Sequence, residues 1–125
     1  MSLSPQLGVA ALPVLDEAQL EAVCGGDREF ESLVCGEFRS TSVAAFDELE
    51  RAITGRAGEP AKAWAHAIKG SAATLGGQAL ARVCQQIETL AAADPDWDLV
   101  ASLLIAARTE YARLDQVFGA RATAA

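Results

Sequence analysis

The chain has 125 residues, which suffices for one domain and excludes two catalytic domains. Apolar residues make up 51% of it, aromatic residues only 6%, and 27 residues are Ala, a composition that favours helices packed through closely spaced aliphatic surfaces. The formal charge of −7 repels phosphate backbones and anionic lipid headgroups, so neither nucleic acid nor a membrane surface is expected as a partner.

The N-terminal stretch, residues 1–13, is expected to be disordered. It lacks a basic segment and contains Pro5 and Pro13, so it does not resemble a signal peptide. No apolar run approaches the roughly 18 residues that span a bilayer. The three cysteines contain no Cys-x-x-Cys pair, which favours buried, inert thiols in a reducing compartment. We therefore expect a soluble, cytoplasmic protein, and the initiating Met and small-residue tail favour a stand-alone chain.

Two helices are predicted in the first half of the chain. Asp16 has the pattern of an N-cap for a short helix that ends at Gly25-Gly26. Asp27 begins a long second helix, in which Gly36 and the run 40–42 leave a kink or break open as an alternative. Its apolar positions, spaced mostly by three and four, are Phe30, Leu33, Val34, Phe38, Phe46, Leu49 and Ile53. Its acidic side chains are expected to be solvated: Glu29, Glu31, Glu37, Asp47, Glu48 and Glu50.

Three further helices follow. Pro60 suits the first turn of a helix over residues 60–75, which Gly76-Gly77 ends, and a fourth helix runs from Gln78 to about residue 93. The run 94–96 caps a fifth helix that extends to about residue 118. No segment alternates like a strand. The predicted fold is all-α: an antiparallel up-and-down four-helix bundle over residues 14–119, with a short extra N-terminal helix and a disordered tail over 120–125.

The only histidine, His66, is predicted to be exposed in the middle of the third helix. At about 100° per residue it shares a face with Lys69, Gly70 and Ala73, turned away from the apolar stripe of that helix. An exposed Gly inside a helix costs about 0.5 to 1 kcal/mol relative to Ala, so its presence one turn from the imidazole suggests that a partner comes close there.

Glu88 is predicted to reach this imidazole from the next helix. His66 precedes the Gly-Gly turn by about as many residues as Glu88 follows it, and at 1.5 Å per residue both lie about 15 Å from the turn. A carboxylate that accepts from the Nδ1 proton leaves the Nε2 lone pair free as a nucleophile. Lys69 would place a positive charge beside a phosphoryl group on Nε2. Gln85 and Gln86 are expected to be solvated.

These residues carry a family resemblance. The run His66-Ala67-Ile68-Lys69-Gly70-Ser71-Ala72-Ala73-Thr74-Leu75-Gly76, followed by Leu80, Cys84, Ile87 and Glu88, resembles the signature H-x-[IL]-K-G-[SA]-x-x-x-[LIV]-G of histidine-containing phosphotransfer (HPt) domains. The strongest match spans residues 66–88, and the helix order also fits over 15–118. The chain departs from many members at Gly77, where they have a larger residue, and a looser turn is expected there.

The resemblance implies a four-helix-bundle intermediate of a two-component phosphorelay without autokinase or ATP-binding activity. His66 would take a phosphoryl group from the aspartyl phosphate of a response regulator receiver domain and pass it to another, in a pathway fed by a sensor or hybrid histidine kinase. Lys69 would stabilise the phosphoryl charge, and Glu88 would orient the imidazole. The partner would dock over Gly70, Ala67, Ala73 and Ser71. No cofactor or metal of its own is implied, because the Mg²⁺ belongs to the receiver.

Two alternatives remain open. One is a phosphorylation-independent adaptor or phosphate sink that binds receiver domains, although His66, Lys69 and Gly70 together argue against it. The other is a carboxylate-bridged metal bundle, which needs Glu-x-x-His motifs on paired helices, and the chain has a single histidine. A monomer is expected, because one bundle uses all the strong apolar stripes.

Overall fold

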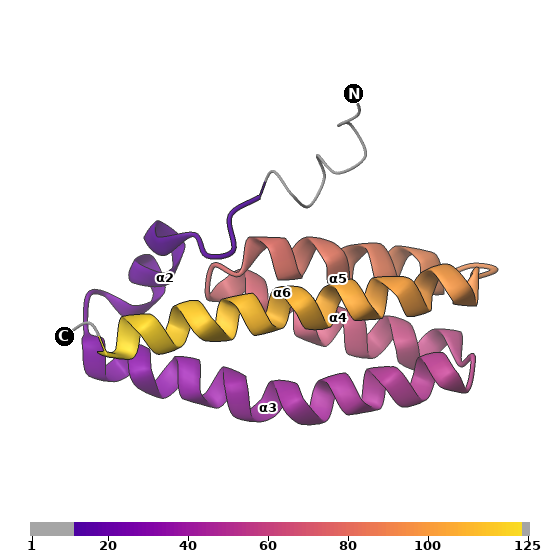
Figure 1. Ribbon diagram of the computed structural model, residues 1–125, viewed down its shortest axis with the longest axis horizontal. Helices are drawn as coiled ribbons and strands as arrows, with labels where there is room; N and C mark the ends of the chain where they lie inside the picture. Colours follow the sequence, from indigo (N-terminus) through magenta and orange to yellow (C-terminus); the bar gives the residue numbers. More distant parts are fainter. Residues whose placement is uncertain (1–11, 124–125) are drawn as a thin grey trace.

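The computed structural model describes residues 12–123, and these form a bundle of helices. The helices are α2 (Glu17–Cys24), α3 (Arg28–Thr54), α4 (Gly58–Thr74), α5 (Gln78–Ala91) and α6 (Trp97–Thr123). Helices α3, α4, α5 and α6 run up and down beside one another, while the short α2 lies across one end (Figure 1). The predicted all-α bundle with an extra N-terminal helix is confirmed. None of the described helices is long and apolar enough to cross a membrane.

The helix starts follow from local sequence chemistry. The Asp16 side chain accepts a hydrogen bond from the Gln19 amide at the start of α2, and the Asp27 side chain accepts one from the Phe30 amide at the start of α3. Helix α3 continues unbroken through Gly36 and residues 40–42, so the alternative of a break there is wrong. Two carboxylates therefore fix where the first helices begin.

The core is built from the apolar stripes of α3 to α6, with small residues where the helices approach closely. Helix α4 has the apolar stripe that its sequence predicts: Ala65, Ile68 and Ala72 are buried, as is Leu75, the C-cap of the helix. On α3, Phe30 and Leu33 are exposed, because the side of this turn that faces α6 is that of Glu31. The three cysteines are free and buried, and burial raises the pKa of the Cys35 thiol to about 11 and that of Cys84 to about 12.

The turn between α4 and α5 is packed tightly. Gly76 has a φ of +90°, and its carbonyl accepts a 2.7 Å hydrogen bond from the Asp16 amide. Gly77 is buried, and a Cβ on it would lie 2.7 Å from Cδ2 of Leu114. The expectation of a looser turn at Gly77 is wrong, because the missing side chain lets α6 approach the backbone. This packing fixes how α4 and α5 are aligned.

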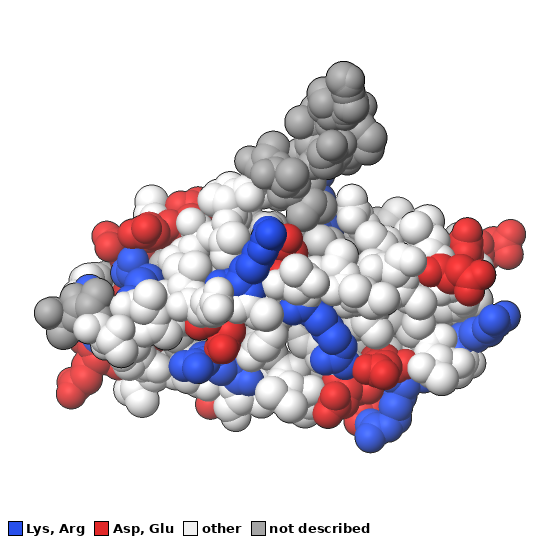
Figure 2. Space-filling model, in the orientation of Figure 1, with Lys and Arg blue, Asp and Glu red and all other residues white. Residues whose placement is uncertain are grey.

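Ion pairs join α3 to α6 along the outside of the bundle. Arg39 pairs with Asp115 at 2.5 Å, and Arg108 pairs with Glu50 at 2.6 Å. Figure 2 shows basic and acidic side chains interspersed over these two helices. Such exposed pairs each contribute about 0–1 kcal/mol, so burial of the apolar stripes holds the two helices together.

One carboxylate on α3 is buried, contrary to the prediction of a fully solvated acidic face. Both oxygens of Glu31 accept hydrogen bonds from Arg121, each 2.9 Å long. Arg121 also lies near Glu17 and Glu21 of α2. The pairing holds the last turn of α6 in place, so the prediction of a disordered tail is wrong for residues 120–123, which are helical. Residues 1–11 and 124–125 of the predicted disordered segments lie outside the described residues.

Replacing Gly76 with Ala is expected to lower the free energy of unfolding by about 3 kcal/mol. The new Cβ would lie 2.4 Å from the Asp16 carbonyl oxygen, and the left-handed backbone adds strain. Gly25→Ala is the control, because Gly25 has a φ of +65° but no neighbour within 4 Å, and it should cost about 1 kcal/mol. Urea denaturation of both variants measures the difference; equal losses would show that the contact with Asp16 adds nothing.

Replacing Glu31 with Gln is expected to cost about 2 kcal/mol of unfolding free energy at pH 7. The hydrogen bonds from Arg121 hold the pKa of Glu31 below its usual value, against the opposing effect of burial. The stabilisation is therefore present above the pKa of the unfolded chain and is lost as the pH falls through the folded pKa. Urea denaturation should show the two proteins converging in stability below about pH 4. A difference that stays constant down to pH 3 would contradict this assignment.

Candidate functional site

His66 lies in the middle of α4, on the side opposite its buried stripe. Its side chain is 65% exposed, as the helical spacing predicted. It borders a shallow hollow between α4 and α5, whose other lining residues are Glu59, Lys62, Ala63 and Glu88. An imidazole in this position is open to a partner that approaches from solvent.

Glu88 of α5 reaches the imidazole across the groove between the helices. Its Oε2 lies 3.0 Å from Nδ1 of His66, and its side chain is only 16% exposed. The pKa of Glu88 is lowered, first by the hydrogen bond from Lys69 and then by the bond with His66, while burial acts in the opposite direction. The carboxylate is therefore ionised at neutral pH and can only accept, so the neutral imidazole carries its proton on Nδ1. The Nε2 lone pair is left free.

Lys69 lies one turn after His66 and turns toward α5. Its Nζ is 2.8 Å from Oε1 of Glu88, so the two oxygens of this carboxylate hold two different groups of α4. Nζ also donates to Oε1 of Gln85, again at 2.8 Å. Gln85 is exposed, as predicted, but its contact with Lys69 was missed. Its position one turn before Glu88 on α5, level with Lys69, is the signal that could have revealed it.

The predicted docking residues form an exposed surface of small side chains. Gly70, Ala67, Ala73 and Ser71 are all exposed, and a Cβ on Gly70 would have no neighbour within 4 Å. The Ser71 hydroxyl donates to the Ala67 carbonyl, as is common for serines inside helices. Gly70 and Ala73 line a hollow whose other residues are Leu12, Gln19, Lys69, Gln78, Ala81, Arg82 and Gln85. This surface lies directly beside the imidazole, and its small side chains let a partner come close to the ring.

The arrangement suits transfer of an anionic group to a nitrogen nucleophile. It combines a free ring nitrogen, a carboxylate that fixes the tautomer and an ammonium group one turn away. Among residues 12–123, no group of three or more His, Cys, Asp or Glu side chains comes together in a way that could hold a metal ion. The described residues thus give no support to the carboxylate-bridged alternative.

Comparisons with known proteins agree with this reading of the fold. The sequence profile of the Hpt domain matches residues 34–117, more than half of the chain. The chain belongs to the Hpt domain family. Its structure is similar to the crystal structure of histidine-containing phosphotransfer protein B (HptB) from Pseudomonas aeruginosa PAO1, with a TM-score of 0.79 over 88% of this chain and 95% of that chain. The two are 20% identical, so this likeness shows the shared fold. No curated protein sequence matches the chain.

Membership in the family confirms the resemblance seen in the sequence and assigns the chain to histidine phosphotransfer in two-component signalling. The matched range contains the His66–Glu88 pair and the whole of α4 and α5. What each residue does in this Hpt domain rests on the geometry described above.

The neutral imidazole of this Hpt domain is expected to carry its proton on Nδ1. Long-range ¹H–¹⁵N NMR spectra of the neutral ring distinguish the two tautomers. Glu88→Leu removes the acceptor and should shift the population toward the Nε2–H form. Glu59→Leu is the control, because Glu59 borders the same hollow and carries the same charge without a bond to the ring. Identical spectra for the wild type and Glu88→Leu would refute the orienting role.

Proposed function

We propose that this protein accepts a phosphoryl group on Nε2 of His66 from the aspartyl phosphate of a receiver domain and passes it to the aspartate of another. The observation that carries the proposal is the bond between Nδ1 of His66 and Glu88, which leaves an exposed Nε2 with a free lone pair. Family membership supports the reaction class. Response regulator receiver domains and a sensor or hybrid histidine kinase are the partners that this role needs.

The chemical step exchanges one bond for another at phosphorus. Nε2 attacks in line, the N–P bond forms, and the bond from phosphorus to the receiver's aspartyl oxygen breaks and leaves a carboxylate there. The ring becomes positively charged, and the ionised Glu88 stabilises that charge while it holds the Nδ1 proton. The ammonium of Lys69 offsets the charge of the phosphoryl oxygens. No proton has to leave the imidazole.

The phosphoryl donor is another protein in this proposal. The sequence contains no G-x-x-x-x-G-K-[ST] loop and no Gly-rich kinase loop to hold a nucleotide. The receiver would supply the Mg²⁺ and the rest of the reaction centre. The small, exposed surface at Gly70, Ala67 and Ala73 gives the receiver room to bring its aspartate to Nε2.

Transfer from a labelled phospho-receiver to the purified protein tests this proposal. The wild type should acquire a label that is labile in acid and stable in alkali, and His66→Gln should acquire none. His66 is the only histidine, so loss of the label in His66→Gln assigns the phosphoryl group to this imidazole. Absence of label with several receivers, together with receiver binding unchanged in His66→Ala, would overturn the proposal in favour of a phosphorylation-independent adaptor.

Replacing Gly70 with Gln is expected to stabilise the fold while it blocks transfer. A Cβ at this position meets no neighbour within 4 Å, and removing a helical Gly should raise the free energy of unfolding by about 0.5–1 kcal/mol. The same side chain would stand where the receiver docks, and the transfer rate should fall at least about ten-fold. Thermal unfolding and transfer kinetics measure the two effects.

Gly36→Gln is the matched control for this variant. Gly36 is also an exposed glycine inside a helix with nothing within 4 Å, but it lies on α3. It should gain a similar stability and transfer phosphate at the wild-type rate. Transfer at the wild-type rate by Gly70→Gln would show that the receiver does not dock over this position.

A further inference from the structure

The ammonium of Lys69 is held by two acceptors on α5 that differ in charge. Its Nζ lies 2.8 Å from the Glu88 carboxylate and 2.8 Å from the amide oxygen of Gln85. Glu88 and Gln85 are one turn apart on the same helix. The Lys69 side chain is 25% exposed, so most of it lies in the groove between α4 and α5.

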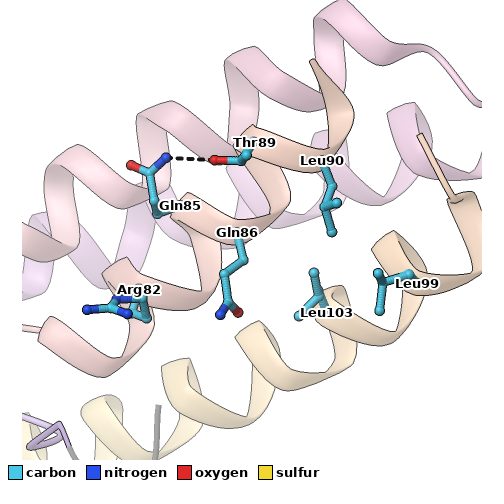
Figure 3. Close-up of a pocket in the computed structure, with 7 residues that line it drawn as sticks. All are labelled: Arg82, Gln85, Gln86, Thr89, Leu90, Leu99 and Leu103. Atoms are coloured by element: carbon cyan, nitrogen blue, oxygen red, sulfur yellow. Dashed lines mark hydrogen bonds between the residues drawn. The ribbon is translucent and has the colours of Figure 1, made fainter. Parts of the chain in front are cut away.

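The amide of Gln85 is itself oriented by a third residue of α5. Its nitrogen donates to Oγ1 of Thr89 at 3.0 Å, a contact that Figure 3 shows, and its oxygen thereby faces Lys69. The reverse orientation would place the amide NH₂ against the ammonium, donor against donor. Thr89 and Lys69 thus impose the same orientation on the Gln85 amide.

The ammonium has one charged and one neutral acceptor in the groove. Glu88 is level with His66, as their direct contact shows. Gln85 precedes Glu88 by one turn and is level with Lys69, and its amide extends along α5 toward Thr89. Gln85 is the weaker of the two acceptors because it is uncharged, so it is the one that an oxygen of a phosphoryl group on Nε2 would replace.

We infer that Gln85 is a positioning residue that holds the ammonium of Lys69 until a phosphoryl group arrives on His66 and replaces it. The inference deepens the proposed function and rests on it. A neutral acceptor binds the ammonium less strongly than a carboxylate does, so Lys69 can exchange this bond for the phosphoryl oxygens. Because the Gln85–Lys69 bond is lost when the Lys69–phosphoryl contact forms, a stronger bond to Gln85 makes phosphorylated His66 less stable. Gln85 thereby shifts the equilibrium between phosphorylated His66 and the phosphorylated receiver.

Two substitutions at this position should act in opposite directions on that equilibrium. Gln85→Met removes the acceptor, so Lys69 no longer loses a bond on moving, and the equilibrium constant toward phosphorylated His66 should rise about three-fold. Gln85→Glu replaces a neutral acceptor with a carboxylate, and the constant should fall about three-fold. Quantifying both phosphorylated proteins at equilibrium with one receiver measures these constants. Shifts in the same direction for both variants, or no shift, would overturn the inference.

Lys69→Ala and Gln86 supply the controls. In a Lys69→Ala background, both effects of substituting Gln85 should disappear, because they act through the ammonium. Gln86 neighbours Gln85, but its side chain turns toward the groove lined by Leu99 and Leu103 (Figure 3). Gln86→Glu adds the same charge, and Gln86→Met makes the same change in size, and both should leave the equilibrium within about two-fold of the wild type.

Failure of the inference can be told apart from failure of the proposed function. A wild-type protein that takes no label from any receiver overturns the proposed function and the inference with it. A wild type that is labelled on His66, combined with Gln85 variants that behave as their Gln86 counterparts do, overturns the inference alone. Effects of Gln85 that persist without Lys69 would show that the residue acts by another route.

Discussion

The site is organised by one carboxylate of α5 that holds two side chains of α4. Glu88, from α5, binds the imidazole of His66 with one oxygen and lies beside the ammonium of Lys69 with the other. Because the carboxylate is largely buried, its charge is screened less by water than that of a surface residue. It determines which ring nitrogen is free, and it keeps the ammonium close to the place where negative charge will accumulate.

This sharing requires α4 and α5 to be aligned along their lengths. A displacement by one residue would rotate Glu88 by about 100° and move it out of reach of the imidazole. The alignment is set at the turn, where Gly76 accepts a hydrogen bond from Asp16 and Gly77 lets Leu114 approach. Residues that take no part in the chemistry therefore keep His66 level with Glu88. The exposed residues around His66 are not needed for this alignment.

Local and periodic features of the sequence predicted much of this. The spacing of residues around the two glycines placed His66 and Glu88 together because both lie on one hairpin, where distance along the helices follows from residue number. The Glu31–Arg121 pair could not be found in this way, because the two residues are far apart in sequence and meet only when α6 closes the bundle. The contact of Gln85 with Lys69 was missed because the paths of two long side chains are not fixed by helical period.

The attachment of the chain ahead of α2 has a practical consequence. Leu12 lines the same hollow as Lys69 and Gly70, and the Asp16 amide fastens the following residues to the turn of the hairpin. Any domain or affinity tag joined ahead of Leu12 is tethered within reach of the face where a partner would sit. Helix α6 ends beside the start of α3 (Figure 1). Neither of these two segments lines this hollow. Fusions and surface immobilisation are therefore better made through the C-terminus.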